Sequence, residues 1–192
     1  MSQLKLTADS GGGTVAIKGP ASTTGNAALD LTVPGTASAT LDTLGRAGNI
    51  LQIVNVIKTD AFTTTDTNHT SAPFGTAVTG LTASITPSSA SNKILVTVML
   101  GLTNSNANYY SYAYLYRGTT LLGATTSISA GGGLGIQTKC IQRLDTPNTT
   151  SSTTYSVRLA AEGNTAKVGE GAGGTADNRV DDSTLTLMEI AA

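Results

Sequence analysis

Residues 109–117 read Tyr-Tyr-Ser-Tyr-Ala-Tyr-Leu-Tyr-Arg and hold five of the chain's six tyrosines. Side chains on a β-strand alternate between the two faces of the sheet, so this stretch predicts a strand with one aromatic face. The tyrosines on that face are Tyr110, Tyr112, Tyr114 and Tyr116. Ala113 and Leu115 fall on the other face. A strand of this kind needs packing partners on both sides, which favours a layered β structure.

Segments that alternate or are apolar throughout, separated by turn residues, continue on either side of this stretch. Residues 50–57 are apolar on both faces, which is typical of a strand buried on two sides. Residues 93–100 place every second apolar side chain on one face and predict a core strand. Further strands are predicted at residues 81–87, 136–144, 155–161 and 184–190. Apolar residues do not recur at helical spacing, so we expect an all-β, antiparallel β-sandwich of jelly-roll type.

The composition limits the classes of function. Of 192 residues, 12% are charged and the net charge is −1, without a basic block of the kind that nucleic-acid binding proteins carry. No apolar run is long enough to span a membrane, and the N-terminus lacks the pattern of a secretory signal. A single cysteine excludes an intrachain disulfide framework. We therefore expect synthesis in a reducing cytoplasm and no nucleic-acid partner or membrane insertion.

Residues 1–48 are predicted to be an extended N-terminal β arm, and residues 49–192 the sandwich domain. Residues 45–48, Gly-Arg-Ala-Gly, mark the boundary. Three short alternating segments in the arm carry too few large apolar side chains to close a core, so the arm must lie on another surface. The side chains predicted to anchor it are Leu4, Leu6, Val15, Ile17, Leu29, Leu31 and Val33.

Several strands have a second apolar face that a two-sheet sandwich leaves uncovered, and this predicts a subunit interface. Its predicted residues are Tyr110, Tyr112, Tyr114, Tyr116, Ile53, Ile57, Met188 and Ile190. Tyrosine suits such a surface because it joins apolar area to a hydroxyl that tolerates water. Two alternatives stay open: the tyrosines fill the core of a single chain, or they form a platform for a glycan.

Catalytic and metal sites find little support in the sequence. Cys140 alternates with strand residues and is predicted to be a small core residue, and His69 sits in a polar loop without an orienting partner. Asp177, Asp181 and Asp182 have oxygen ligands for calcium, but their spacing differs from that of an EF-hand and favours a solvated turn. The glycine clusters lack a following helix and are not phosphate loops. We expect no enzyme activity, no cofactor and no bound metal.

Two parts of the chain resemble virion structural proteins of tailed phages, particularly those of cyanophages. Residues 4–20 and 29–34 are similar to the N-terminal arm of that family. Residues 50–54, 80–87, 92–96, 115–118 and 187–190 are similar to its distal β-sandwich. The resemblance implies a homotrimer on the outer surface of a virion, as capsid decoration or at the tip of a tail fibre or tailspike.

The arm passes straight into the sandwich, whereas many fibre proteins of this family insert a long shaft. The short reach favours a capsid cement protein whose arm binds the major capsid protein or another virion protein. The alternative is a distal module of a tail fibre or tailspike that recognises the host surface, where polysaccharide is the expected partner.

Overall fold

Ten strands follow one another in the part of the chain that the computed structural model describes, which is residues 46–128, 135–171 and 181–192. They are β1 (Ile50–Lys58), β2 (Phe62–Thr64), β3 (Thr76–Ile85), β4 (Lys93–Asn104), β5 (Tyr110–Arg117), β6 (Thr120–Ile128), β7 (Gln137–Asp145), β8 (Thr153–Ala161), β9 (Ala166–Val168) and β10 (Ser183–Ile190). Most pass through sequence rich in β-branched and aromatic residues, which fit a pleated, half-buried backbone. These residues contain no helix, and the all-β prediction is confirmed.

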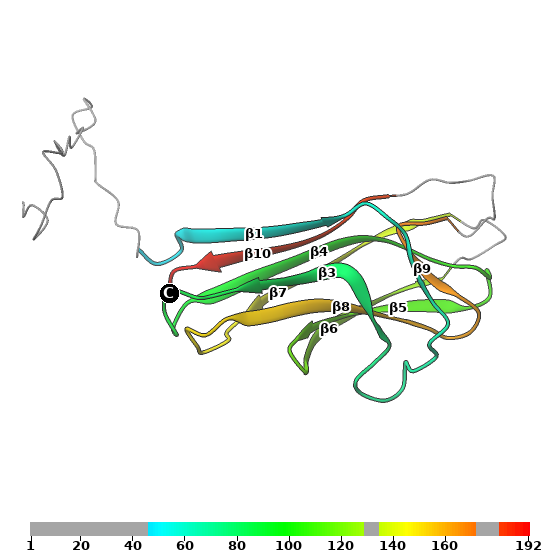
Figure 1. Ribbon diagram of the computed structural model, residues 1–192, viewed down its shortest axis with the longest axis horizontal. Coiled ribbons are helices and arrows are strands. Elements are labelled where there is room, and N and C mark those ends of the chain that lie inside the picture. The colour runs from blue at the N-terminus through cyan, green and yellow to red at the C-terminus, as the bar shows by residue number, and fades with distance from the viewer. Residues whose placement is uncertain (1–45, 129–134, 172–180) are drawn as a thin grey trace, which may run out of the picture. The chain divides into compact units, whose positions relative to one another are not determined.

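The strands form two antiparallel sheets that pack face to face (Figure 1). Sheet A begins with the order β1–β10–β4. Beyond β4 the sheet has two branches: β7 pairs with most of β4, and β9, followed by β2, pairs with the end of β4. Sheet B has the order β3–β8–β5–β6. Without the short β2 and β9, the order β1–β10–β4–β7 opposite β3–β8–β5–β6 is that of a jelly roll, as the sequence predicted.

The core lies between the sheets and follows the period of two in the sequence. In β4, Ile94, Val96 and Val98 are completely buried, which confirms the core strand predicted there. The inward residues of β10, β5 and β8 meet them: Leu185, Leu187, Ala113, Leu115, Tyr155, Val157 and Leu159. Burying a large aliphatic side chain stabilises the fold by about 1.5–3 kcal/mol, so this layer supplies most of the stability.

β1 differs from its prediction as a strand buried on two sides. Val54 and Val56 pack against the core, but Ile53 and Ile57 are 58% and 57% exposed. The reason is position: β1 is the edge of sheet A, and among the described residues it pairs only with β10.

Cys140 is exposed, so its prediction as a core residue was wrong. Its neighbour Ile141 takes the inward position in β7, and alternation then places Cys140 on the outer face opposite Met99.

The predicted anchoring side chains of the arm, and Asp177, lie outside the described residues. Within the described ranges no cluster of three or more His, Cys, Asp or Glu side chains is placed to hold a metal ion. Those ranges also contain no helix of the length and apolarity that a membrane crossing requires.

One carboxylate, that of Glu189 in β10, is completely buried. Its Oε1 accepts hydrogen bonds from the Ser88 amide (2.6 Å), the Ser88 hydroxyl (2.8 Å) and Asn92 Nδ2 (2.6 Å), and its Oε2 accepts one from Gln52 Nε2 (2.5 Å). Burial raises the pKa of Glu189, but the donors from Asn92, Gln52 and Ser88 outweigh burial and hold the pKa below its usual value. The cluster joins β1, β10 and the turn between β3 and β4.

Candidate functional site

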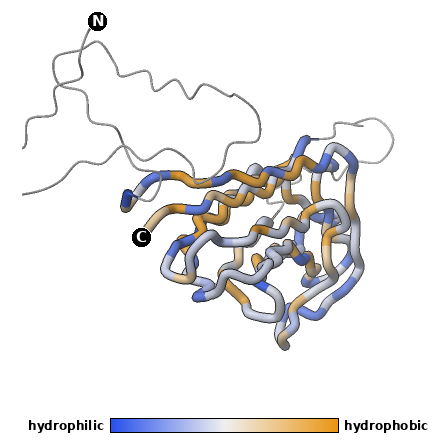
Figure 2. Tube along the Cα trace, turned by 60° about the vertical axis from the view of Figure 1, so that its left-hand side comes forward, coloured by the Kyte–Doolittle hydropathy of each residue, from blue (hydrophilic) through white to orange (hydrophobic). Residues whose placement is uncertain are grey.

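The outer face of sheet A carries most of the exposed large apolar side chains of the described residues. Five of the eight lie there: Ile50, Ile53, Ile57, Met99 and Leu144. Figure 2 shows the apolar character along β1 and β10. We call this surface the sheet A face. Exposed patches of this kind on a folded domain mark interaction sites.

Strand register aligns these side chains into rows that cross the sheet. In one row Ile53 lies opposite Met188, Met188 opposite Leu95, and Leu95 opposite Leu144. A second row, four residues further along β1, joins Ile57, Thr184, Met99 and Cys140. Apolar groups therefore lie at both the β1 side and the β7 side of the face.

A row of polar side chains lies between these two rows, and its members hydrogen-bond one another. Asn55 Nδ2 donates to Thr186 Oγ1 at 2.7 Å, and Gln142 Nε2 donates to Thr97 Oγ1 at 3.2 Å. Removing a polar group from water costs less free energy when the group keeps a hydrogen-bond partner. The sheet A face can therefore be covered by protein at low desolvation cost.

β1 also offers its backbone at the edge of the sheet. From Ile50 to Ile57 it holds no proline and no charged residue, the features that usually protect an edge strand from pairing with other chains. An unprotected edge next to an apolar face favours contact with another protein surface.

The tyrosines of β5 lie on the opposite side of the sandwich, on the outer face of sheet B. Residues 65–75 cover Tyr112, Tyr114 and Tyr116, but Tyr110 stays exposed. Phe74 stacks on Tyr114 with ring centroids 4.8 Å apart, and His69 stacks on Tyr112 at 4.9 Å. The Phe74 amide donates to the Tyr116 hydroxyl at 2.9 Å. Tyr114 and Tyr116 are only 5% and 2% exposed. Burial, with smaller contributions from Tyr112 and Tyr116, raises the pKa of Tyr114 to about 12, so its hydroxyl is neutral at physiological pH.

Charged and polar groups hold the covering segment in place. The Asp66 carboxylate accepts hydrogen bonds from the Asn68 amide (2.9 Å) and the Thr76 hydroxyl (2.8 Å), and both lower the pKa of Asp66. Arg158 donates to the carbonyls of Phe74 and Gly75. Gly75 has a φ of +63°, and a Cβ there would lie 2.3 Å from the Leu159 carbonyl oxygen, so only glycine fits.

The eight predicted interface residues thus fall into two groups. Ile53, Ile57, Met188 and Ile190 come together on the sheet A face. The four tyrosines lie behind the other sheet, where Tyr114 and Tyr116 leave almost no surface for a second copy. Tyr114 and Tyr116 therefore agree with the alternative interpretation, in which the tyrosines pack within a single chain.

His69 and Cys140 are likewise separated, since His69 stacks on the outer face of sheet B and Cys140 lies on the sheet A face. Sequence reasoning missed Ile50, Leu95, Met99 and Leu144 as surface residues. The alternation in β4 and β7 carries a signal for them, but only the pairing of these strands with β10 and β1 shows that they share one face.

The hydroxyl of Tyr116 is expected to hold the covering segment. Tyr116→Phe should lower the free energy of unfolding by about 1–2 kcal/mol, because the Phe74 amide loses its acceptor. Urea denaturation measures the change, and hydrogen exchange at the Phe74 amide should accelerate. Tyr110→Phe is the matched control, since the Tyr110 hydroxyl has no partner among the described residues. Equal exchange rates in the two variants would contradict the role given to Tyr116.

No family model and no curated protein matches the sequence. Comparison with solved structures finds the infectious bursal disease virus Gx strain (TM-score 0.33), its VP2 subviral particle (0.30) and its Gt strain (0.33), each 14% identical to this chain. Each match covers 86% of this chain but only 41–42% of the viral chain, so this chain spans less than half the length of those proteins.

Proposed function

We propose that the chain is a virion structural protein of a tailed phage, which assembles as a trimer on the outer surface of the capsid and stabilises the head shell. The sheet A face is the observation that carries the proposal. A chain that leaves so much aligned apolar surface on one side of a jelly roll is built to be covered. The resemblance of the arm and of several strands to virion proteins of tailed phages is the reason for assigning the chain to a virion.

The occupant proposed for the sheet A face is a second copy of the same chain. A ring of three or more copies needs two different, complementary surfaces on each copy, so that one side of a subunit meets the other side of the next. The face has two apolar sides, Ile53 and Ile57 on β1 and Leu144 and Cys140 on β7. Three copies that join the β1 side of one to the β7 side of the next cover both. The number three comes from the resemblance to phage virion proteins.

The arm provides the attachment to the shell in this proposal. Residues 1–48 precede β1 in the sequence, so each copy in a trimer contributes one arm. The apolar side chains of the arm bind the major capsid protein or a neighbouring virion protein. Quantitative gel analysis of purified virions tests the location: hundreds of copies per particle support a cement protein, and a few dozen or fewer refute it.

The single cysteine gives a direct test of the assembly face. Cys140 is exposed in the isolated chain but lies within the proposed contact, so its thiol should react with a maleimide about tenfold more slowly in the trimer than in the subunit. Dilution below the assembly range is expected to restore fast labelling. The rate is followed by mass spectrometry. A labelling rate that does not depend on protein concentration would remove Cys140 from the interface.

A second candidate is the distal module of a tail fibre or tailspike. Tyr109 and Tyr110 are exposed at the start of β5, beside the exposed carboxylate of Glu162, which accepts a hydrogen bond from the Tyr110 amide at 3.0 Å. Exposed aromatic rings beside polar groups suit recognition of a host surface. Purified protein that adsorbs to host cells, together with a low copy number in virions, would favour this candidate over the capsid role.

A further inference from the structure

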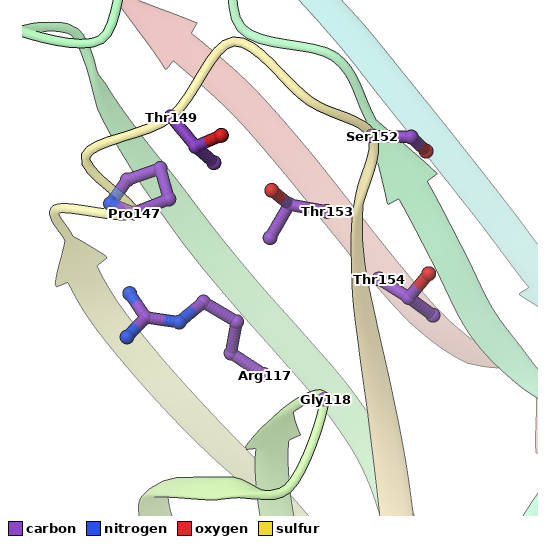
Figure 3. A pocket seen from close by; sticks show the side chains of 7 residues that line it. All are labelled: Arg117, Gly118, Pro147, Thr149, Ser152, Thr153 and Thr154. Atoms are coloured by element: carbon purple, nitrogen blue, oxygen red, sulfur yellow. The ribbon is translucent and has the colours of Figure 1, made fainter.

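An open depression lies between the turn that joins β5 to β6 and the loop that joins β7 to β8. Its volume is about 380 Å³, in the range of small-molecule sites. The residues around it are Arg117, Gly118, Pro147, Thr149, Ser152, Thr153 and Thr154 (Figure 3). The guanidinium of Arg117 and the hydroxyl side chains of Thr149 and Thr153 point into this space, which has room for a single sugar ring, whereas Ser152 and Thr154 point away from it (Figure 3).

The guanidinium of Arg117 is held in a fixed orientation from one side. Its Nη1 donates to both carboxylate oxygens of Asp145, at 2.8 and 2.9 Å, and to the Thr146 carbonyl at 3.3 Å. The Tyr155 hydroxyl donates to Asp145 Oδ2 at 2.7 Å. Burial, and then the bond to Asp145, raise the pKa of Tyr155, so this hydroxyl stays protonated.

The other edge of the guanidinium is left for a ligand. Nε and Nη2 of Arg117 have no acceptor among the described residues, although the side chain is 27% exposed at the depression. These two nitrogens present parallel N–H groups, the geometry that binds a carboxylate through both oxygens. Asp145 binds the guanidinium through Nη1, so a ligand on the Nε and Nη2 edge does not compete with Asp145 for the same nitrogens.

The hydroxyls beside Arg117 supply both donors and acceptors. Thr149 Oγ1 accepts from the Ser151 amide at 3.0 Å, which leaves its proton to donate. Thr153 Oγ1 donates to the Ser151 carbonyl at 3.1 Å, which leaves its lone pairs to accept. Neighbouring donors and acceptors of this kind match the hydroxyl groups of a sugar.

We propose that this depression binds an acidic sugar, with the carboxylate on the Nε and Nη2 edge of Arg117 and the ring hydroxyls on Thr149 and Thr153. The site is formed by loops and not by the sheet A face, so it does not depend on the assembly proposed above. It would give the particle an affinity for acidic polysaccharide. Because the depression is open, the ligand can be the end of a longer chain.

The test titrates the full-length protein with D-glucuronate and follows binding by saturation-transfer NMR. We expect saturable binding with a Kd on the order of 1 mM, and binding at least about tenfold weaker for D-glucose, which has the same ring without the carboxylate. Arg117→Lys should abolish measurable binding, because lysine keeps the charge but loses the two-pronged geometry.

Arg117 also contacts Asp145, so a second pair of variants separates binding from folding. Thr149→Val should weaken glucuronate binding several-fold with an unchanged melting temperature, whereas Ser152→Ala, at a side chain that points away from the depression, should not weaken it. Thr63→Val, at an exposed threonine that does not line the depression, is the matched control and should bind as the wild type does. Equal affinity for glucose and glucuronate, absence of saturation, or unchanged binding by Thr149→Val would each overturn the proposal.

Discussion

Glu189→Ala is expected to lower the free energy of unfolding by about 3–5 kcal/mol. The substitution removes, at a completely buried position, the acceptor that Gln52, Ser88 and Asn92 share. Gln52 Nε2 keeps only the Thr86 carbonyl and Asn92 Nδ2 only the Ser88 hydroxyl as acceptors. The damage should spread from β10 to β1 and to the turn between β3 and β4, because the carboxylate accepts hydrogen bonds from both of these elements. Urea denaturation at neutral pH measures the loss.

The acid dependence of stability provides an independent readout for the same group. The pKa of Glu189 is lower in the folded protein than in the unfolded chain, so its contribution is complete above the unfolded value near 4.5 and is lost as the pH falls through the folded value. The wild type should therefore lose stability below about pH 4.5. Glu189→Gln should be less stable at pH 7 but should lose less on acidification.

The matched control is Glu162→Gln, at an exposed glutamate. It should leave the free energy of unfolding within about 0.5 kcal/mol of the wild type. If Glu189→Ala were no more destabilising than this control, the buried cluster would not be a stabilising element.

Ile53→Asp is expected to convert the proposed trimer to single subunits, with a loss of affinity of at least about 100-fold. The carboxylate would enter the apolar row that crosses β1, β10, β4 and β7, where Met188 is the neighbour of Ile53 and no cation lies in that row. Burying an unpaired charge costs far more than losing the isoleucine contact. Because Ile53 is exposed in the single chain, the fold itself should keep its stability.

Leu121→Asp is the matched control, since Leu121 is an exposed large apolar residue on β6 of the other sheet. It should remain trimeric in sedimentation velocity at the concentration where Ile53→Asp sediments as a single subunit. A wild-type protein that stays monomeric at about 50 µM, or a trimeric Ile53→Asp, would show that copies of the chain do not meet through the sheet A face.

Local sequence by itself determined the fold class and the central strands. Side chains on a strand alternate whatever the rest of the chain does, so the apolar positions of residues 93–100 identified the inward face of β4, and the period of two excluded helices. Turn residues between short strands then favoured the jelly roll. The spacing of Ile53 and Ile57 likewise placed both on one face of β1 before their surroundings were known.

Only the tertiary structure decided what covers each of those faces. Alternation divides a strand into two sides but cannot say which side meets the core, a distant loop or solvent, because those contacts join residues far apart in the chain. Tyr114 and Tyr112 of β5 are covered by Phe74 and His69 from a segment that reads as a polar loop. Ile53 stays open because β1 is an edge strand, and Cys140 is outside because Ile141 took the inward position.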